Sequence, residues 1–388
     1  MEENKSFKLK DLLKMDLKDI KLNFPNKTKS KKKIVNKKLP KKVISLDIGS
    51  NTIKFAVGKY DKDKVIIDKL IKVKTPEKSV DNGIITNKEA VLDIVDYIIK
   101  NEGIKAKHVI YTTDSTTIMT REVVIPMVEE DEMETVIRYE IQQVLPIEIN
   151  NYILQYTILD TIENEMEGTK KYKVSTILYQ DRIAREYYNL LNDSNIKPYA
   201  LDITSNSLKK LIGIADYING TKVNDEETIA FIDLGAQSIN INIYKNRELD
   251  FTRLIRSGGN DINNQLINIL DLPRNTVENT KIEKINLKDI KEDDEFNNLI
   301  EETIGVWLDD IGRFLQFYRN RNVGNTIDKV YIYGGSSNIT GIEHYMSNKL
   351  NLQVQKIKSI NKVDVLSPLS KEEGLETYIN AIGAIIRL

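Results

Sequence analysis

Apolar and polar positions follow two different rhythms along the chain from Lys41 onward. Short runs rich in Ile and Val, which predict β-strands, alternate with stretches of helical periodicity. The first strands are predicted at Val43–Leu46, Ile53–Val57 and Val65–Val73. Alternation of this kind predicts an α/β fold, in which helices cover the faces of a sheet.

The second half of the chain repeats the opening of the first. Residues 43–57 (VISLDIGSNTIKFAV) align without gaps with residues 229–243 (IAFIDLGAQSININI), at an offset of 186 positions. An Asp-x-Gly triplet stands at the same place in both copies, beginning at Asp47 and at Asp233. Self-similarity at one fixed offset indicates a duplication, here of about half the molecule.

Each copy places its Asp-x-Gly turn directly after a strand of buried type. Because glycine has no side chain, an anion can approach the N–H groups of such a turn closely. A carboxylate beside a polyphosphate needs a cation between them, so Asp47 and Asp233 imply a Mg²⁺ held mostly through water. Lys54 is either a phosphate contact or an exposed cross-strand lysine. The candidate ligand-contacting residues of the two turns are Asp47, Gly49, Ser50, Asn51, Lys54, Asp233, Gly235, Ala236, Gln237 and Ser238.

A third turn, rich in glycine, follows the predicted strand Val330–Tyr333. Its residues Gly334, Gly335 and Ser336 offer bare backbone against which a ribose or a base can lie. One Asp-x-Gly or Gly-Gly turn by itself is usually only a turn. Two copies facing each other across a cleft would hold phosphates from both sides, so we predict a nucleotide site.

Composition narrows the chemistry further. The chain has 388 residues, no cysteine and two histidines. The length allows two domains of ordinary size, and the composition excludes disulfides and argues against a Cys- or His-ligated metal. There is no run of about 18 apolar residues and no signal-peptide pattern, so we expect a cytoplasmic protein.

Charge divides the chain into a basic N-terminal tail and an acidic body. Residues 1–42 carry 15 lysines and 5 acidic residues, a net charge of +10, which leaves −11 for the remainder of a chain whose total is −1. We expect residues 1–40 to form a flexible tail. The tail is either a solvated extension or a short amphipathic helix on an anionic membrane surface. Its lysines lack interleaved aromatic residues, so we expect no nucleic-acid binding.

The order of the three turns resembles that of the actin, Hsp70 and sugar-kinase superfamily. The resemblance implies an actin-like ATPase fold, with duplicated RNase H-like domains that bind ATP and Mg²⁺ between them. Asp202–Ile212 and Tyr378–Ile386 would be its two crossing helices, and Gly383 would allow them to approach closely. Glu278 and Lys281 are spaced like a Glu-x-x-Lys pair that borders the nucleoside in the FtsA branch; an exposed helical ion pair is the alternative.

Residues 120–146 (TREVVIPMVEEDEMETVIRYEIQQVLP) are similar to the inserted subdomain 1C of FtsA and PilM proteins. We favour the PilM family of type IV pilus assembly, because the sequence ends within its last predicted helix, where FtsA proteins continue to a membrane-targeting helix. The implied subdomains are 1A at residues 41–119 and 174–215, 1C at 120–173, 2A at 216–255 and 325–388, and 2B at 256–324.

For function, the resemblance implies an ATP-binding adaptor at the inner face of the cell membrane. It would bind the cytoplasmic N-terminus of a PilN-like membrane protein in a groove between subdomains 1A and 1C, and link it to pilus motor ATPases. A homo-oligomer is a further expectation. Hydrolysis should be slow at most, since Asp233 and Asp202 are the candidates to organise a metal or water and neither is an evident strong base. An FtsA-like division filament and a small-molecule kinase stay open as alternatives.

Overall fold

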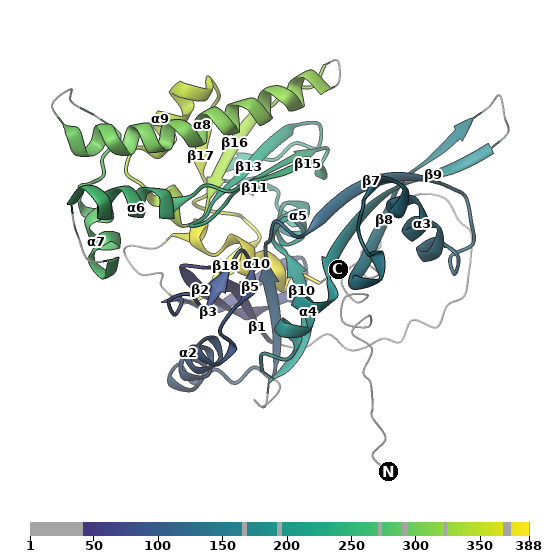
Figure 1. Cartoon of the computed structure of the whole chain (residues 1–388), viewed down its shortest axis with the longest axis horizontal. Coiled ribbons are helices and arrows are strands. Elements are labelled where there is room, and N and C mark those ends of the chain that lie inside the picture. The colour runs from purple at the N-terminus through teal and green to yellow at the C-terminus, as the bar shows by residue number, and fades with distance from the viewer. Residues whose placement is uncertain are drawn as a thin grey trace, which may run out of the picture.

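The computed structural model describes residues 42–164, 169–191, 196–270, 274–288, 290, 294–321, 324–367 and 374–387. The expected tail at residues 1–40 lies outside these ranges. The described residues form two large sheets, one small three-stranded sheet and two two-stranded sheets, with helices between and around them (Figure 1).

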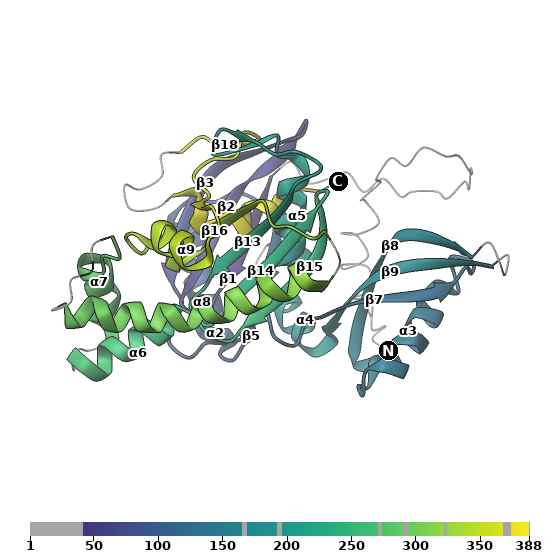
Figure 2. The same ribbon diagram turned by 90° about the horizontal axis from the view of Figure 1, so that it is seen from above.

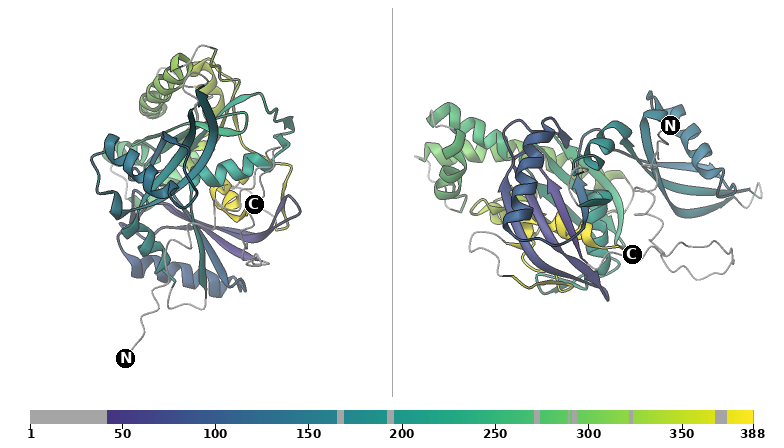
Figure 3. Two further views of the ribbon diagram at one scale, coloured as in Figure 1. Left: turned by 90° about the vertical axis from the view of Figure 1, so that its right-hand side faces the viewer. Right: turned by 90° about the horizontal axis from the view of Figure 1, so that it is seen from below.

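The first large sheet has six strands in the order β10-β6-β1-β2-β3-β18. β1, β2 and β3 form an antiparallel meander, whereas β6 runs parallel to β1 and β10 runs parallel to β6. The helices α2 and α4 cover its outer face through an apolar cluster that includes Ile44, Leu46 and Val95, and the right-hand view of Figure 3 shows α2 on the strands. The bounds are β1 Val43–Ile48, β2 Thr52–Asp61, β3 Lys64–Lys74, β6 His108–Thr113, β10 Lys197–Ile203, β18 Val363–Val365, α2 Lys88–Asn101 and α4 Asp181–Tyr188.

The second large sheet repeats this topology with five strands in the order β15-β14-β13-β16-β17. β13, β14 and β15 form the meander, and β16 runs parallel to β13. Its outer face packs on α6, α8 and α9 around the buried Trp307. The predicted duplication is therefore confirmed in the fold. The bounds are β13 Thr228–Leu234, β14 Ile239–Lys245, β15 Glu248–Ile255, β16 Lys329–Tyr333, β17 Val354–Lys356, α6 Gly259–Leu270, α7 Arg274–Lys284, α8 Glu295–Arg321 and α9 Ile342–Leu350.

Two helices, α5 (Thr204–Ile214) and α10 (Ile379–Ile385), cross between the large sheets. One apolar cluster joins both helices to the inner faces of both sheets, with Leu211, Phe231 and Ile382 among its members. A Cβ on Gly383 would lie 2.2 Å from the carbonyl oxygen of Ser207, so only glycine allows this approach. The expected crossing is confirmed.

The small sheet stands to one side of the large sheets, as Figure 2 shows. It has the order β7-β9-β8, with β7 at Met119–Pro126, β8 at Tyr152–Asn164 and β9 at Thr169–Gln180. The helix α3 (Met133–Val144) covers one face through Ile137 and Ile141. Because β8 pairs with β9 as far as residue 180, this sheet extends beyond the predicted limit of subdomain 1C at residue 173.

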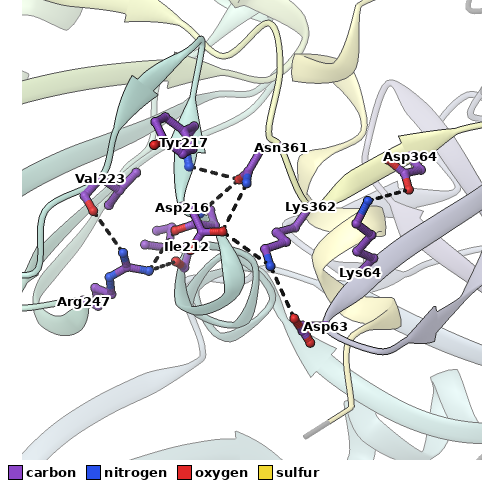
Figure 4. A network of polar contacts seen from close by, with 11 residues as sticks. Asp63, Lys64, Ile212, Asp216, Tyr217, Val223, Arg247, Asn361, Lys362 and Asp364 are labelled. Atoms are coloured by element: carbon purple, nitrogen blue, oxygen red, sulfur yellow. Dashed lines mark hydrogen bonds and ion pairs between the residues drawn. The ribbon is translucent and has the colours of Figure 1, made fainter.

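The segments that cross between the large sheets are tied to each other by polar contacts (Figure 4). The Asn361 side-chain oxygen accepts hydrogen bonds from the amides of Asp216 and Tyr217, both at 3.0 Å. Lys362 pairs with Asp63 at 3.3 Å and with Asp216 at 3.4 Å. These contacts hold the two halves together where the chain passes from one to the other.

The remaining short elements connect this framework. They are β4 Val80–Asp81, β5 Ile84–Ile85, β11 Tyr217–Ile218, β12 Thr221–Lys222 and the 3-10 turns Ile149–Asn151, Gly335–Asn338 and Leu375–Thr377. Over the described ranges, no helix combines the length and the apolar character that crossing a membrane requires.

Candidate functional site

A cavity of about 730 Å³ lies between the two halves, at the carboxyl ends of β1 and β13. Its volume is in the range of pockets that hold small molecules and cofactors. Residues of both Asp-x-Gly turns and of the third turn line it. Of the predicted residues, the structure brings together Asp47, Gly49, Ser50, Asn51, Lys54, Asp233, Gly235, Ala236, Gln237, Ser238, Lys281, Gly335 and Ser336.

The two Asp-x-Gly turns have the same backbone hydrogen bond. The amide of Gly49 donates to the carbonyl of Thr52 at 3.1 Å, and the amide of Gly235 donates to the carbonyl of Ser238 at 3.0 Å. These pairs are related by the offset found in the sequence. The duplication therefore extends to the individual hydrogen bonds of the turns.

The residue opposite the aspartate differs between the turns. Asp47 faces Lys54 across β1 and β2, whereas Asp233 faces Asn240 across β13 and β14. The ammonium of Lys54 donates to a carboxylate oxygen of Asp47 at 3.0 Å, and both side chains are largely buried. Burial by itself would lower the pKa of Lys54, but Asp47 and Asp233 outweigh it and raise that pKa. Lys54 is thus a buried cation, which removes the alternative of an exposed lysine.

Asp233 has a different environment from Asp47. The side-chain amide of Asn380 donates to its Oδ2 at 2.8 Å. Burial raises the pKa of Asp233 to about 6, against the opposing effects of Asn380 and Lys54. Gly334 does not line the cavity as predicted; instead it packs under this carboxylate, and a Cβ there would lie 2.2 Å from Oδ1.

A third carboxylate lines the cavity that the sequence analysis missed. Asp114 follows β6, the strand next to β1, and accepts hydrogen bonds from the Ser115 amide at 2.8 Å and the Thr204 hydroxyl at 3.1 Å. Burial raises the pKa of Asp114 to about 7, and the charges of Asp233 and Asp47 add to the effect. Its position at the carboxyl end of a parallel strand was the available signal, because ligands bind there in open α/β sheets.

A pair of glycines at the start of α6, Gly258 and Gly259, was also missed. The amide of Gly259 donates to the carbonyl of Gly235 at 3.0 Å, and the amide of Asn260 to that of Ala236 at 2.8 Å. A Cβ on Gly258 would lie 2.6 Å from each of those two carbonyl oxygens. The helix therefore begins directly on the second turn and fixes its position. In the sequence this pair could not be distinguished from an ordinary loop.

The predicted role of Asp202 as an organiser of a metal or water has to be corrected. This residue lies away from the cavity, where its carboxylate contacts Lys210 at 2.5 Å, Asn206 at 2.6 Å and Arg387 at 3.6 Å. Burial would raise the pKa of Asp202, but Lys210 and Arg387 outweigh it and lower that pKa. Its role is to neutralise two buried cations beside the crossing helices, so it cannot organise a metal or water at the cavity.

Lys281 lines the cavity and is buried, and its ammonium donates to the side chain of Asn263 at 3.1 Å. It is therefore not the exposed half of a helical ion pair. Glu278 lies on α7, but its side chain is outside what the structure describes. Its pairing with Lys281 stays a prediction.

Three aspartates of the cavity are the candidates to hold a metal ion. Asp47, Asp114 and Asp233 all line the cavity, yet among the described residues no three Asp, Glu or His side chains are close enough to hold one ion directly. Mg²⁺ ordinarily keeps several of its waters and is shared with substrate phosphates. The residues fit a Mg²⁺ held through water and do not fit a metal held by protein ligands alone.

The two homologous halves and the cavity between them define an actin-like ATPase fold. The particular family follows from the sequence. The model of the type IV pilus assembly protein PilM family matches residues 45–387, so the chain belongs to that family. Membership places it among the proteins of type IV pilus assembly, and favours that role over the division filament and the kinase.

Solved structures agree with this assignment of the fold. A PilM-PilN type IV pilus biogenesis complex superposes with a TM-score of 0.74 at 16% sequence identity, covering 88% of this chain and 97% of that one. The ethanolamine utilization protein EutJ from Carboxydothermus hydrogenoformans has a TM-score of 0.51 at 12% identity, covering 98% of both chains. At these identities the likeness concerns the fold. No curated protein matches the sequence.

Proposed function

We propose that the cavity binds ATP with Mg²⁺ and that the bound nucleotide sets the angle between the two halves. The observation that carries the proposal is the pair of matched Asp-x-Gly turns on opposite walls of one cavity. Lys54, which is largely buried, and Lys281, which is buried, would compensate phosphate charge, and the third turn would lie against the nucleoside. Mg²⁺ would lie between the phosphates and the carboxylates of Asp47 and Asp233, through water.

Slow hydrolysis is part of the proposal. Attack on the γ-phosphate needs a water held in line with the leaving oxygen. Asp114 replaces Asp202 as a candidate to hold that water, since Asp114 lines the cavity and its pKa of about 7 suits proton transfer near neutral pH. Asp233 keeps its proposed role beside the metal.

The second part of the proposal concerns partners. The small sheet and α3 would form, with the first large sheet, the groove for the cytoplasmic N-terminus of a PilN-like membrane protein. This chain shares its fold with a solved structure of a PilM-PilN complex, and that likeness supports such a partner. Contact with pilus motor ATPases, self-association and a position at the inner face of the membrane belong to the same proposal.

Nucleotide binding can be tested with a fluorescent ATP analogue titrated with and without Mg²⁺. We expect saturable binding that Mg²⁺ strengthens, and loss of that Mg²⁺ effect in Asp233→Ala. Asp61→Ala is the matched control, because Asp61 is an exposed carboxylate that pairs with Lys59 on the same strand. Binding by Asp233→Ala that still responds fully to Mg²⁺ would contradict the placement of the metal.

Partner binding can be tested by fluorescence anisotropy with a peptide of the cytoplasmic N-terminus of a PilN-like protein. Val124 on β7 is 48% exposed, so Val124→Asp should weaken peptide binding without unfolding the protein. Tyr97→Asp is the control, since Tyr97 is 57% exposed and lies on α2, away from the small sheet. Equal affinity of all three proteins would rule out this face as the groove.

A further inference from the structure

One glutamine of the second half bonds directly to the first half. Gln237, in the second Asp-x-Gly turn, donates from Nε2 to Oδ1 of Asp81 at 3.0 Å. Its Oε1 accepts a hydrogen bond from the amide of Asn82, also at 3.0 Å. Both ends of the amide group are thus engaged across the cleft, on the turn between β4 and β5.

The turn that Gln237 holds is itself fixed to the first half. The side-chain nitrogen of Asn82 donates to the hydroxyl of Thr116 at 2.6 Å, and the Thr116 amide donates back to Asn82 Oδ1 at 2.9 Å. The hydroxyl of Tyr187 donates to the carbonyl of Gly83 at 2.9 Å. Gln237 therefore bonds to a turn whose position in the first half is fixed by other hydrogen bonds.

A second contact closes a ring across the same opening. Nη2 of Arg256, directly after β15 in the second half, donates to the hydroxyl of Thr116 at 2.9 Å. We call the five residues Asp81, Asn82, Thr116, Gln237 and Arg256 the cleft clasp. All five line the cavity. The clasp and the crossing helices α5 and α10 both join the halves, and the cavity lies between those halves.

The use of both amide atoms changes the role expected for Gln237. Nε2 carries a second N–H, but the two bonds across the cleft hold the amide group in place, so turning it toward a phosphate would break them. Each such bond stabilises the closed arrangement, and more so where a charged group such as Asp81 takes part. The closed cleft is therefore held by contacts that need no ligand.

We propose that the cleft clasp is the gate for nucleotide exchange, and that Gln237 is a positioning residue that keeps the cleft closed rather than a phosphate ligand. The inference rests on the proposed function, because it takes ATP as the ligand of the cavity. A ligand enters or leaves when the bonds of Gln237 and Arg256 break and the halves part. The clasp then controls the rates of binding and release more strongly than the affinity.

Stopped-flow release of the fluorescent ATP analogue tests the gate. Gln237→Ala should speed release and uptake by about tenfold each, which corresponds to roughly 1.4 kcal/mol, with little change in the dissociation constant. Asp81→Ala removes only one of the two bonds of Gln237 and should have a smaller effect of the same sign. The double variant should be no faster than Gln237→Ala, because that substitution already removes the bond to Asp81. Glu102→Ala, in an exposed ion pair with Lys69 on the first half, should leave both rates unchanged.

A charge exchange separates the clasp from a general loss of structure. Gln237→Glu alone places two carboxylates together and should open the clasp further. Adding Asp81→Asn restores a donor opposite an acceptor and should bring the release rate back toward that of the wild type. Additive effects of the two alanine variants, or no rescue in the exchanged pair, would overturn the proposal.

Hydrogen exchange supplies a readout that needs no nucleotide. The amide of Asn82 donates to Gln237, so Gln237→Ala should remove its protection while amides in β1 keep theirs. Failure of the wild type to bind ATP would overturn the proposed function and the gate together, while loss of protection at Asn82 would still establish the clasp as a contact. Normal ATP binding with unchanged release in Gln237→Ala would overturn the gate alone.

Discussion

In the first Asp-x-Gly turn the aspartate faces a lysine across the two strands, and in the second it faces an asparagine. Lys54 neutralises Asp47 at 3.0 Å, whereas Asn240 opposite Asp233 carries no charge. Duplication has kept the backbone of the turn, and the side chains at the matched cross-strand positions have diverged. The consequence is that the aspartate of the first turn has a cation opposite it across the strands and the aspartate of the second turn does not.

This asymmetry explains where an added cation is needed. Lys54 acts on both carboxylates, since Asp47 and Asp233 each raise its pKa. The pKa values of Asp233, about 6, and Asp114, about 7, nevertheless stay raised, so ionising them in the ligand-free protein is unfavourable. A Mg²⁺ ion that arrives with ATP would supply the charge that the second turn lacks.

The largest effect is expected when the first turn loses its cation. Lys54→Met leaves Asp47 buried beside a neutral side chain, and removing one partner of a buried ion pair typically costs about 3–5 kcal/mol. Chemical denaturation should show a loss of that size. Lys59→Met is the control on the same strand, because its pair with Asp61 is exposed and should contribute less than about 1 kcal/mol. Equal losses for both variants would contradict the burial argument.

Removing the charge of the second turn should have the opposite sign. The folded-state pKa of Asp233, about 6, is above the ordinary value of 3.8, so the folded protein binds more protons than the unfolded one between those values. Stability therefore falls as pH rises from about 4 to 6, and the loss is complete above pH 6. Asp233→Asn should stabilise the ligand-free protein by roughly 2–3 kcal/mol at pH 8 and by much less at pH 4.

Denaturation curves of wild type and Asp233→Asn at the two pH values check this prediction. Asp47→Asn is the sharper comparison, because it removes the partner of buried Lys54 and should destabilise the protein. The two substitutions would then change the free energy of unfolding in opposite directions. Destabilisation of the same size by both substitutions would show that the turns are electrostatically equivalent.

The packing of α6 against the second turn can be disrupted without changing the charge of that turn. Gly258→Ala places a Cβ 2.6 Å from the carbonyl oxygens of Gly235 and Ala236, and overpacking of this kind costs about 1–3 kcal/mol. We expect a loss of about 2 kcal/mol together with weaker ATP binding. Gly305→Ala is the control, since a Cβ there meets nothing within 4 Å inside α8 and should stabilise the protein slightly.

The smallest effect is expected when the second turn is given the residue of the first. Asn240→Lys places an ammonium opposite Asp233, as Lys54 is placed opposite Asp47. An added cation should replace part of the charge that Mg²⁺ supplies, so the Mg²⁺-dependent gain in ATP affinity should fall by about tenfold. ATP titrations with and without Mg²⁺ measure it, with Asn240→Gln as the neutral control. If Mg²⁺ strengthened ATP binding by Asn240→Lys as much as in the wild type, Asp233 would not be the residue beside the metal.

Much of the fold could be predicted from the chain itself. The offset between Asp47 and Asp233 predicted two homologous halves, because strand periodicity and turn glycines are local properties that survive duplication. Residues 128–144 have the periodicity of a helix with acidic residues in its first turn, but α3 begins only at Met133. The acidic start satisfied the helical pattern, but the first fully buried side chain of the helix is Met133, and burial decides where a helix becomes stable.

The site was predicted where it depends on turn chemistry and missed where it depends on distant contacts. Asp202 and Asp114 are both single acids near strand ends, and the sequence does not distinguish them. Arg387, 185 positions from Asp202, is one of the two cations that neutralise it, while Asp114 opens onto the cavity. Desolvation and ion pairing depend on neighbours in space, which no local pattern encodes.

By itself the sequence determined that the molecule consists of two matched halves, each with an Asp-x-Gly turn after a buried strand, since these features follow from local periodicity and the conformational demands of a turn. Only the tertiary structure decided what each residue of those turns does. It made Lys54 a buried cation shared by two carboxylates and made Gln237 a contact across the cleft. Charge and hydrogen bonding act through space, and the residues that set them come from opposite halves of the chain.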